Sequence, residues 1–69
     1  MFHALVRLAH AEALDAAGDR AAAVAAIAAA RAELLGVAGR IRDERARAGF
    51  LARHEVNART LALAEAWGA

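Results

Sequence analysis

The sequence AGDR at residues 17–20 divides the first half of the chain into two apolar runs. Gly18 is the residue type that tolerates the left-handed conformation just past a helix end, and Asp19 can accept hydrogen bonds from the free N–H groups of a following turn. Before this stretch, Leu5 and Leu8 fall near one side of a 3.6-residue repeat. We therefore predict that one helix ends here and another begins with almost no linker, which is a helical hairpin.

The run after the turn, over residues 20–35, is rich in alanine. Val24, Ile27 and Leu34 recur at helical spacing, and most residues between them are alanine. Alanine has the highest helix propensity and loses almost no side-chain entropy, and its small side chain lets another helix approach closely. We expect this helix to continue through two glycines to about Gly39, although each glycine costs about 1 kcal/mol relative to alanine.

Capping residues mark two further helices in the second half. Asp43 is a predicted N-cap, and Glu44 in the first turn suits the helix dipole of a third helix that runs to about residue 53. Residues 54–57 are interpreted as a turn, with Asn57 capping a fourth helix over residues 58–67. We expect an all-α fold of four helices in two antiparallel hairpins, in a single domain over residues 1–69.

Several residues of the first hairpin carry a family resemblance. They form a pattern of small residue, large residue, Gly-Asp turn, small, large and small residue: Ala11, Leu14, Gly18, Asp19, Ala23, Ile27 and Ala30. This pattern resembles a tetratricopeptide repeat, whose unit is about 34 residues of helix-turn-helix. The chain departs from that repeat at Arg7, where a large aromatic residue is usual, at His10, where leucine is usual, and at Leu35, where a closing proline is frequent.

The second half extends the resemblance. Residues 49–51 (GFL) and 57–64 (NARTLALA) are similar to the closing segment of tetratricopeptide-like arrays at the carboxyl end of large bacterial multidomain regulators. The resemblance implies a last repeat over residues 3–35 and a capping hairpin over residues 43–67. It also implies that the partners are proteins or neighbouring repeats.

The size and composition of the chain predict a thin core and association with other chains. A domain of 69 residues buries only about 60% of its unfolded surface, and alanine adds little buried area. We therefore expect a homo-oligomer, with a dimer favoured. The large core residues are predicted to be Phe2, Leu5, Leu8, Leu14, Val24, Ile27, Leu34, Ile41, Phe50, Leu51, Val56, Leu61, Leu63 and Trp67.

The termini and charge pattern favour a soluble, cytoplasmic protein. The formal net charge is +1, and there is no cysteine for a disulfide framework or thiol chemistry. The longest apolar run, residues 21–30, has about half of the roughly 20 residues that span a bilayer. Polar residues interrupt the N-terminal segment, which therefore lacks the apolar core of a signal peptide. We expect no membrane partner.

The sequence contains no set of residues that commits it to catalysis or to metal binding. Thr60 carries its only hydroxyl group, and its carboxylates are scattered among arginines, so we predict that the protein is not an enzyme and needs no cofactor. His3 and His10 are seven residues apart, about 10 Å along one helix, which is too far for one metal ion. We expect no metal site.

The candidate interaction residues lie on the first and fourth helices. In tetratricopeptide proteins the first helix of each repeat lines the inner groove, and the resemblance places Leu5, Leu8, Glu12 and Asp15 there. Leu61 and Leu63 lie about 160° apart on the fourth helix, so this helix is apolar on more than one side. Leu61 and Trp67 are therefore also predicted to belong to the interface. The predicted function is a non-catalytic module for protein interaction or self-assembly.

An arginine-rich segment supports an alternative of another class. Its basic residues are Arg40, Arg42, Arg45, Arg47 and Arg53. Arginine can bind phosphates through its forked donors, which would suit a small dimeric nucleic-acid-binding regulator. Against this, Asp43 and Glu44 lie within the segment, and no aromatic, Asn or Gln side chain that could contact bases is interleaved with its arginines over residues 40–47. A solvated helix face is the favoured interpretation.

Overall fold

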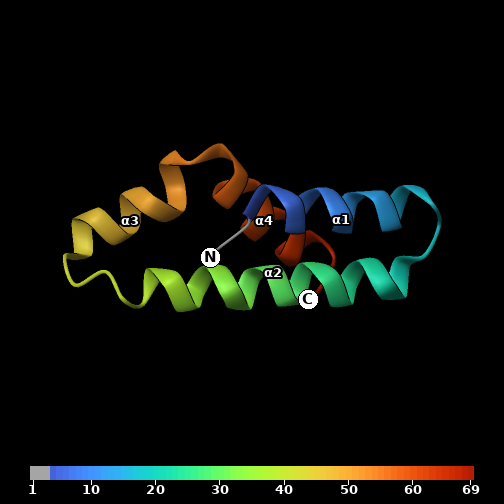
Figure 1. Ribbon diagram of the computed structural model, residues 1–69, viewed down its shortest axis with the longest axis horizontal. Coiled ribbons are helices and arrows are strands. Elements are labelled where there is room, and N and C mark those ends of the chain that lie inside the picture. Colours follow the sequence, from blue (N-terminus) through green and yellow to red (C-terminus); the bar gives the residue numbers. More distant parts are fainter. Residues whose placement is uncertain (1–3) are drawn as a thin grey trace.

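The computed structural model describes residues 4–69, apart from the side chain of Arg53, and its regular structure is entirely helical (Figure 1). The helices are α1 (Ala4–Ala16), α2 (Arg20–Ala38), α3 (Glu44–Arg53) and α4 (Glu55–Ala66). The predicted all-α fold with four helices is confirmed. Phe2 and His3, which the sequence suggested for the core and for a surface histidine pair, lie outside the described residues.

The turn between α1 and α2 has the predicted local structure. Gly18 has φ of 85°, in the left-handed region that favours glycine. The Asp19 N–H donates to the Leu14 carbonyl at 3.0 Å, which closes the end of α1. The Asp19 carboxylate accepts a hydrogen bond from the Ala22 N–H at 3.2 Å, and thereby caps α2. The short connection brings the two helices back alongside each other.

Helices α1 and α2 run antiparallel and side by side (Figure 1). Leu8 and Ala11 of α1 pack with Ile27 and Ala30 of α2 in one buried cluster. The buried residues of α2 recur every three or four positions along its whole length: Ala23, Ile27, Ala30, Leu34 and Ala38. The predicted continuation of α2 through Gly36 is confirmed, with Gly39 as the C-cap.

Helix α4 completes the core from the other half of the sequence. Ala64 is fully buried in the same cluster as Leu8 and Ile27, and Val56, Leu63 and Trp67 pack against this cluster. Ile27 and Leu34 are the only large side chains that are fully buried among the described residues. The core is therefore three helices thick but small in volume, as the alanine content predicted.

Helix α3 lies at the end of the molecule, beyond the start of α1 (Figure 1). None of its described side chains is buried. Phe50 and Leu51, which are predicted for the core, are half-buried, and Ala46 is exposed. This exposure follows from the position of α3, which contacts α4 and α2 but not α1. The Asp43 carboxylate caps this helix by accepting from the Arg45 N–H at 3.3 Å, as predicted.

The connection between α3 and α4 corrects a prediction. His54 is both the C-cap of α3 and the N-cap of α4, so the predicted turn over residues 54–57 is a corner of one residue. Asn57 does not cap α4, because it lies inside that helix and is 4% exposed. Its Nδ2 donates instead to the Phe50 carbonyl at 3.0 Å, one of the last four carbonyls of α3 that lack a helical partner. Asn57 thus joins the two helices.

Candidate interaction surfaces

The structure separates the two leucines that were predicted to share a groove on α1. Leu8 is 4% exposed and belongs to the core, so it is not available to a partner. Leu5 is 65% exposed, because three residues rotate its side chain by about 60° around the helix. It lines a mostly apolar hollow of about 340 Å³ together with Phe50 and Val56. Its predicted place in the core is therefore wrong.

The predicted acidic groove residues are used within the chain. Oε2 of Glu12 accepts from Arg59 of α4, at 3.0 Å from Nε and 2.6 Å from Nη2. Oδ1 of Asp15 accepts from Nη1 of Arg20 at 2.7 Å. All these side chains are at least one-third exposed, so each pair is worth at most about 1 kcal/mol. Glu12 and Asp15 therefore brace the fold at its surface.

The two predicted interface residues of α4 have different surroundings. Trp67 packs against the core, and the guanidinium carbon of Arg20 lies 4.9 Å from the centre of its ring. This cation–π contact links the end of α4 to the start of α2. Leu61 is half-buried and borders an open hollow of about 480 Å³ that Arg31 and Glu65 also line. Leu61 thus remains partly accessible, whereas Trp67 is mainly engaged within the chain.

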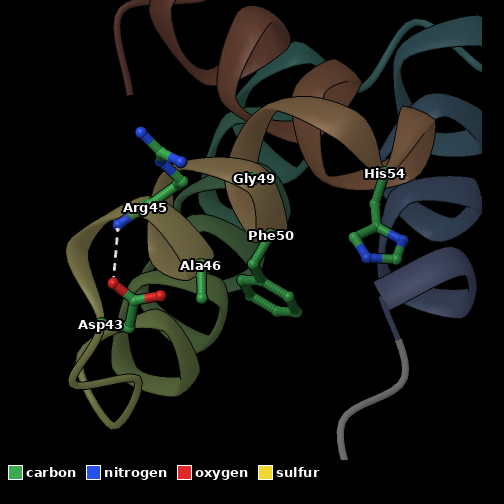
Figure 2. Close-up of a pocket in the computed structure, with 6 residues that line it drawn as sticks. All are labelled: Asp43, Arg45, Ala46, Gly49, Phe50 and His54. Atoms are coloured by element: carbon green, nitrogen blue, oxygen red, sulfur yellow. Dashed lines mark hydrogen bonds between the residues drawn. The ribbon is translucent and has the colours of Figure 1, made fainter.

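The arginine-rich segment does not converge on one site. Arg47 donates from Nε and Nη2 to the Ile41 carbonyl, at 3.2 and 3.0 Å, and is therefore engaged in closing the loop before α3. Arg40, Arg42 and Arg45 are exposed, and the side chain of Arg53 lies outside the described part of the structure. In Figure 2 the Arg45 side chain points away from Phe50 and His54. Phosphate-binding donors are present, but their arrangement is dispersed.

The hollow in Figure 2 has no grouping suited to catalysis. It measures about 420 Å³ and is lined by Asp43, Arg45, Ala46, Gly49, Phe50 and His54. The Phe50 and His54 rings meet edge to face, with their centres 5.8 Å apart. The Asp43 carboxylate is turned toward the Arg45 N–H as the helix cap. The carboxylate of this hollow therefore serves as a helix cap.

The other side chains that could take part in catalysis or metal binding are either hydrogen-bonded within the chain or isolated from one another. Thr60 is 2% exposed, and its hydroxyl donates to the Val56 carbonyl at 2.9 Å, so it is not placed to act as a nucleophile. Within residues 4–69, no group of three His, Asp or Glu side chains is arranged to hold a metal ion. His10 is exposed on α1. These positions offer no evidence for a chemical activity.

An open groove runs between α1 and α2. It consists of two adjoining hollows of about 660 and 510 Å³ that share Arg7 and Ala29, and no residue of α4 lines either one. Its α2 side is mostly alanine and glycine: Ala22, Ala25, Ala26, Ala29, Ala32, Glu33, Gly36 and Val37. Leu14 and His10 line it from α1, and Arg40 lies at its far end. We call this surface the α1–α2 groove.

Helix α2 is unusually apolar for a helix with so much free surface. An 18-residue window within it has a mean hydropathy of 1.7, but only 28% of that window is buried. By length and composition it is the one helix in residues 4–69 that could cross a membrane, a criterion that core helices also meet. Its contacts with α1 and α4 cover one side, whereas Leu35 on another side is 40% exposed. The uncovered side of α2 forms much of the α1–α2 groove.

Comparisons with known proteins give no family for this chain. No protein-family model matches the sequence, and no curated protein or solved structure matches it either. The tetratricopeptide resemblance therefore rests on the residues themselves.

Proposed function

We propose that this chain is a non-catalytic protein-interaction module that works by self-association through packed helices. The observation that carries this proposal is the contrast between the hydropathy of α2 and its small buried share, 28%. Apolar surface that stays in water is unfavourable by about 25 cal/mol per Å², so covering it favours association. The α1–α2 groove is the place where a further helix would cover it.

The tetratricopeptide-like packing is part of this proposal. Four residues of the quoted pattern, Ala11, Ala23, Ile27 and Ala30, are buried, and Gly18 supplies the turn. Small buried residues let neighbouring helices approach closely, which is how repeat arrays stack one hairpin on the next. In such an array the exposed side of a terminal hairpin is covered by its neighbour. A cytoplasmic module of two helical hairpins that uses this surface fits the proposal.

Molar mass measured by light scattering over a concentration series tests the proposal, with helical content followed by circular dichroism. We expect the mass to rise from that of one chain toward that of two. The variant Ala32→Glu places a charge in the α1–α2 groove and should stay monomeric at concentrations where the parent chain associates. Ala62→Glu is the matched control, since Ala62 is also exposed on a helix but lies outside the groove.

Three results of these light-scattering experiments would have different meanings. A fully helical chain that remains a monomer at every concentration contradicts self-association. Loss of association in Ala32→Glu alone supports the groove as the contact surface. Equal loss in both variants means that added negative charge, rather than the groove, controls association.

A further inference from the structure

We infer that a second copy of this chain covers the outer side of α2, which forms one wall of the α1–α2 groove, with the α2 helices of the two copies packed antiparallel about a two-fold axis next to Ala29. This inference rests on the proposed self-association and adds to it the surface, the occupant and the direction of packing. Symmetric dimers of this kind place the same surface of both copies in contact.

The charges along α2 limit what can lie against this helix. Between Arg20 and Arg40 the only charged residues are Arg31 and Glu33, and both lie beside other helices. Arg31 shares a hollow with Leu61 and Glu65 of α4, while Nη2 of Arg7 in α1 lies 3.8 Å from Oε2 of Glu33. The outer side of α2 is therefore uncharged along its length. Its exposed residues are small, with one leucine: Ala21, Ala25, Ala28, Ala29, Ala32, Leu35 and Gly36.

A helix that packs closely against this side of α2 must itself present small, uncharged side chains. The exposed sides of the other helices do not meet this requirement, because α1 carries Arg7 and His10, and α3 carries several arginines. The exposed side of α4 includes Glu55, Arg59 and Glu65. Among the described helices only α2 offers an uncharged outer side, so α2 of a second copy is the element of this chain that matches. Small residues on both helices permit a separation near the lower end of the usual 8–10 Å.

The charges at the two ends of α2 determine the direction in which the second copy packs. The Asp19 carboxylate stands at the N-terminal end and accepts only from backbone N–H. Arg40 and Arg42 stand just past the C-terminal end, and neither forms an ion pair within residues 4–69. Antiparallel packing brings these arginines toward Asp19 of the second copy at both ends. Parallel packing would instead place the arginines of the two copies together, and like charges repel.

This pairing also sets the register. If Arg40 of one copy lies opposite Asp19 of the other, the midpoint between them falls between Ala29 and Ala30. Ala30 is buried in the core and Ala29 is exposed, so Ala29 is the outer residue nearest to the axis. The two copies of Ala29 are then about 1.5 Å apart along the helix direction, whereas the two copies of Ala25 are about 14 Å apart, at 1.5 Å per residue.

Single cysteines test this arrangement cleanly, because the natural chain has none. Mild oxidation of Ala29→Cys should convert most of the protein into a covalent dimer on a denaturing gel without reductant. Ala25→Cys is the matched control on the same outer side of α2. It should remain a single chain, because a disulfide needs Cα atoms within about 7 Å of each other. Circular dichroism of both reduced variants verifies that they fold.

A charge variant tests the direction independently. Arg40→Glu should raise the dissociation constant of the dimer about 3- to 10-fold in low salt, because a favourable contact becomes a repulsive one at both ends. The difference from the parent chain should shrink as salt is added. An unchanged dissociation constant would contradict the proposed pairing with Asp19.

The remaining results distinguish this inference from the proposed function. Equal cross-linking at both cysteine positions would mean parallel or non-specific contact and would overturn the antiparallel arrangement. No cross-linking in Ala29→Cys, beside a parent chain that is dimeric by light scattering, would leave self-association standing and refute the α2 contact. A parent chain that never associates would refute both.

Discussion

Ile27 provides the most direct test of how this small core is held together. Its side chain is fully buried, and the cluster around it contains Leu8 but otherwise mainly alanines, among them Ala11, Ala30 and Ala64. In Ile27→Ala the transfer cost of three lost carbons is about 2.4 kcal/mol, from about 0.8 kcal/mol per methylene. Alanines have no side-chain rotation with which to fill the space, so most of the cavity should persist. We expect a total cost of about 4 kcal/mol, toward the upper end of such substitutions.

This cost is a large part of the stability that a chain of 69 residues can have, about 3 to 10 kcal/mol. Urea unfolding of Ile27→Ala, followed by circular dichroism and by the fluorescence of Trp67, measures the loss. Leu5→Ala is the control, because Leu5 is 65% exposed and its truncation should cost less than about 1 kcal/mol. If the alanine variant is unfolded, Ile27→Val still gives a measurable loss of stability, which we expect to be about 1 kcal/mol.

A loss of stability in Ile27→Ala no larger than that in Leu5→Ala would contradict a rigidly packed core. That result would mean that the helices close over the missing side chain, and that alanine packing in this core is adaptable rather than rigid.

Three further substitutions test separate features of the fold. Gly18→Ala should lower the free energy of unfolding by about 1 kcal/mol, because φ of 85° strains any residue with a Cβ; an unchanged urea midpoint would contradict this. Asn57→Ala should cost about 1 to 3 kcal/mol because it leaves the Phe50 carbonyl without its donor, and thermal unfolding measures the loss. Glu12→Gln should cost at most about 1 kcal/mol, and the difference from the parent chain should fade in high salt as measured by urea unfolding, since its pair with Arg59 is exposed.

The turn and the helix caps, whose structure depends on residues adjacent in the sequence, were predictable from the sequence. The turn follows from Gly18 and Asp19, whose conformation and capping bond are local, and Asp43 marked α3 in the same way. Asn57 was mistaken for a cap because the carbonyl that it satisfies belongs to the preceding helix, and only the packed structure brings the two together.

The buried side of α1 was harder to predict, because alanine and leucine are both apolar and occur all around this helix. The core uses Leu8 and Ala11, whereas Leu5 is exposed. Sequence periodicity cannot distinguish these sides when alanine can fill either one. The position of the α1–α2 groove was equally hard to predict, because it depends on which face of the hairpin is covered by α4. The alanine content indicated that the helices pack closely. It did not indicate which side of the hairpin would remain uncovered.

None of the described side chains of α3 is buried, and this has a consequence for how the protein opens. Amide hydrogens exchange with solvent according to the free energy of the local opening that exposes them. Helix α4 has its own contacts with α1 and α2, through Ala64 and through the Arg59 pair with Glu12, so it can stay docked while α3 unwinds. In that partly opened state α3 becomes a flexible tether between two docked elements. The backbone of α3 is therefore expected to exchange earliest among the four helices, and a protease would cut there before the rest of the chain unfolds.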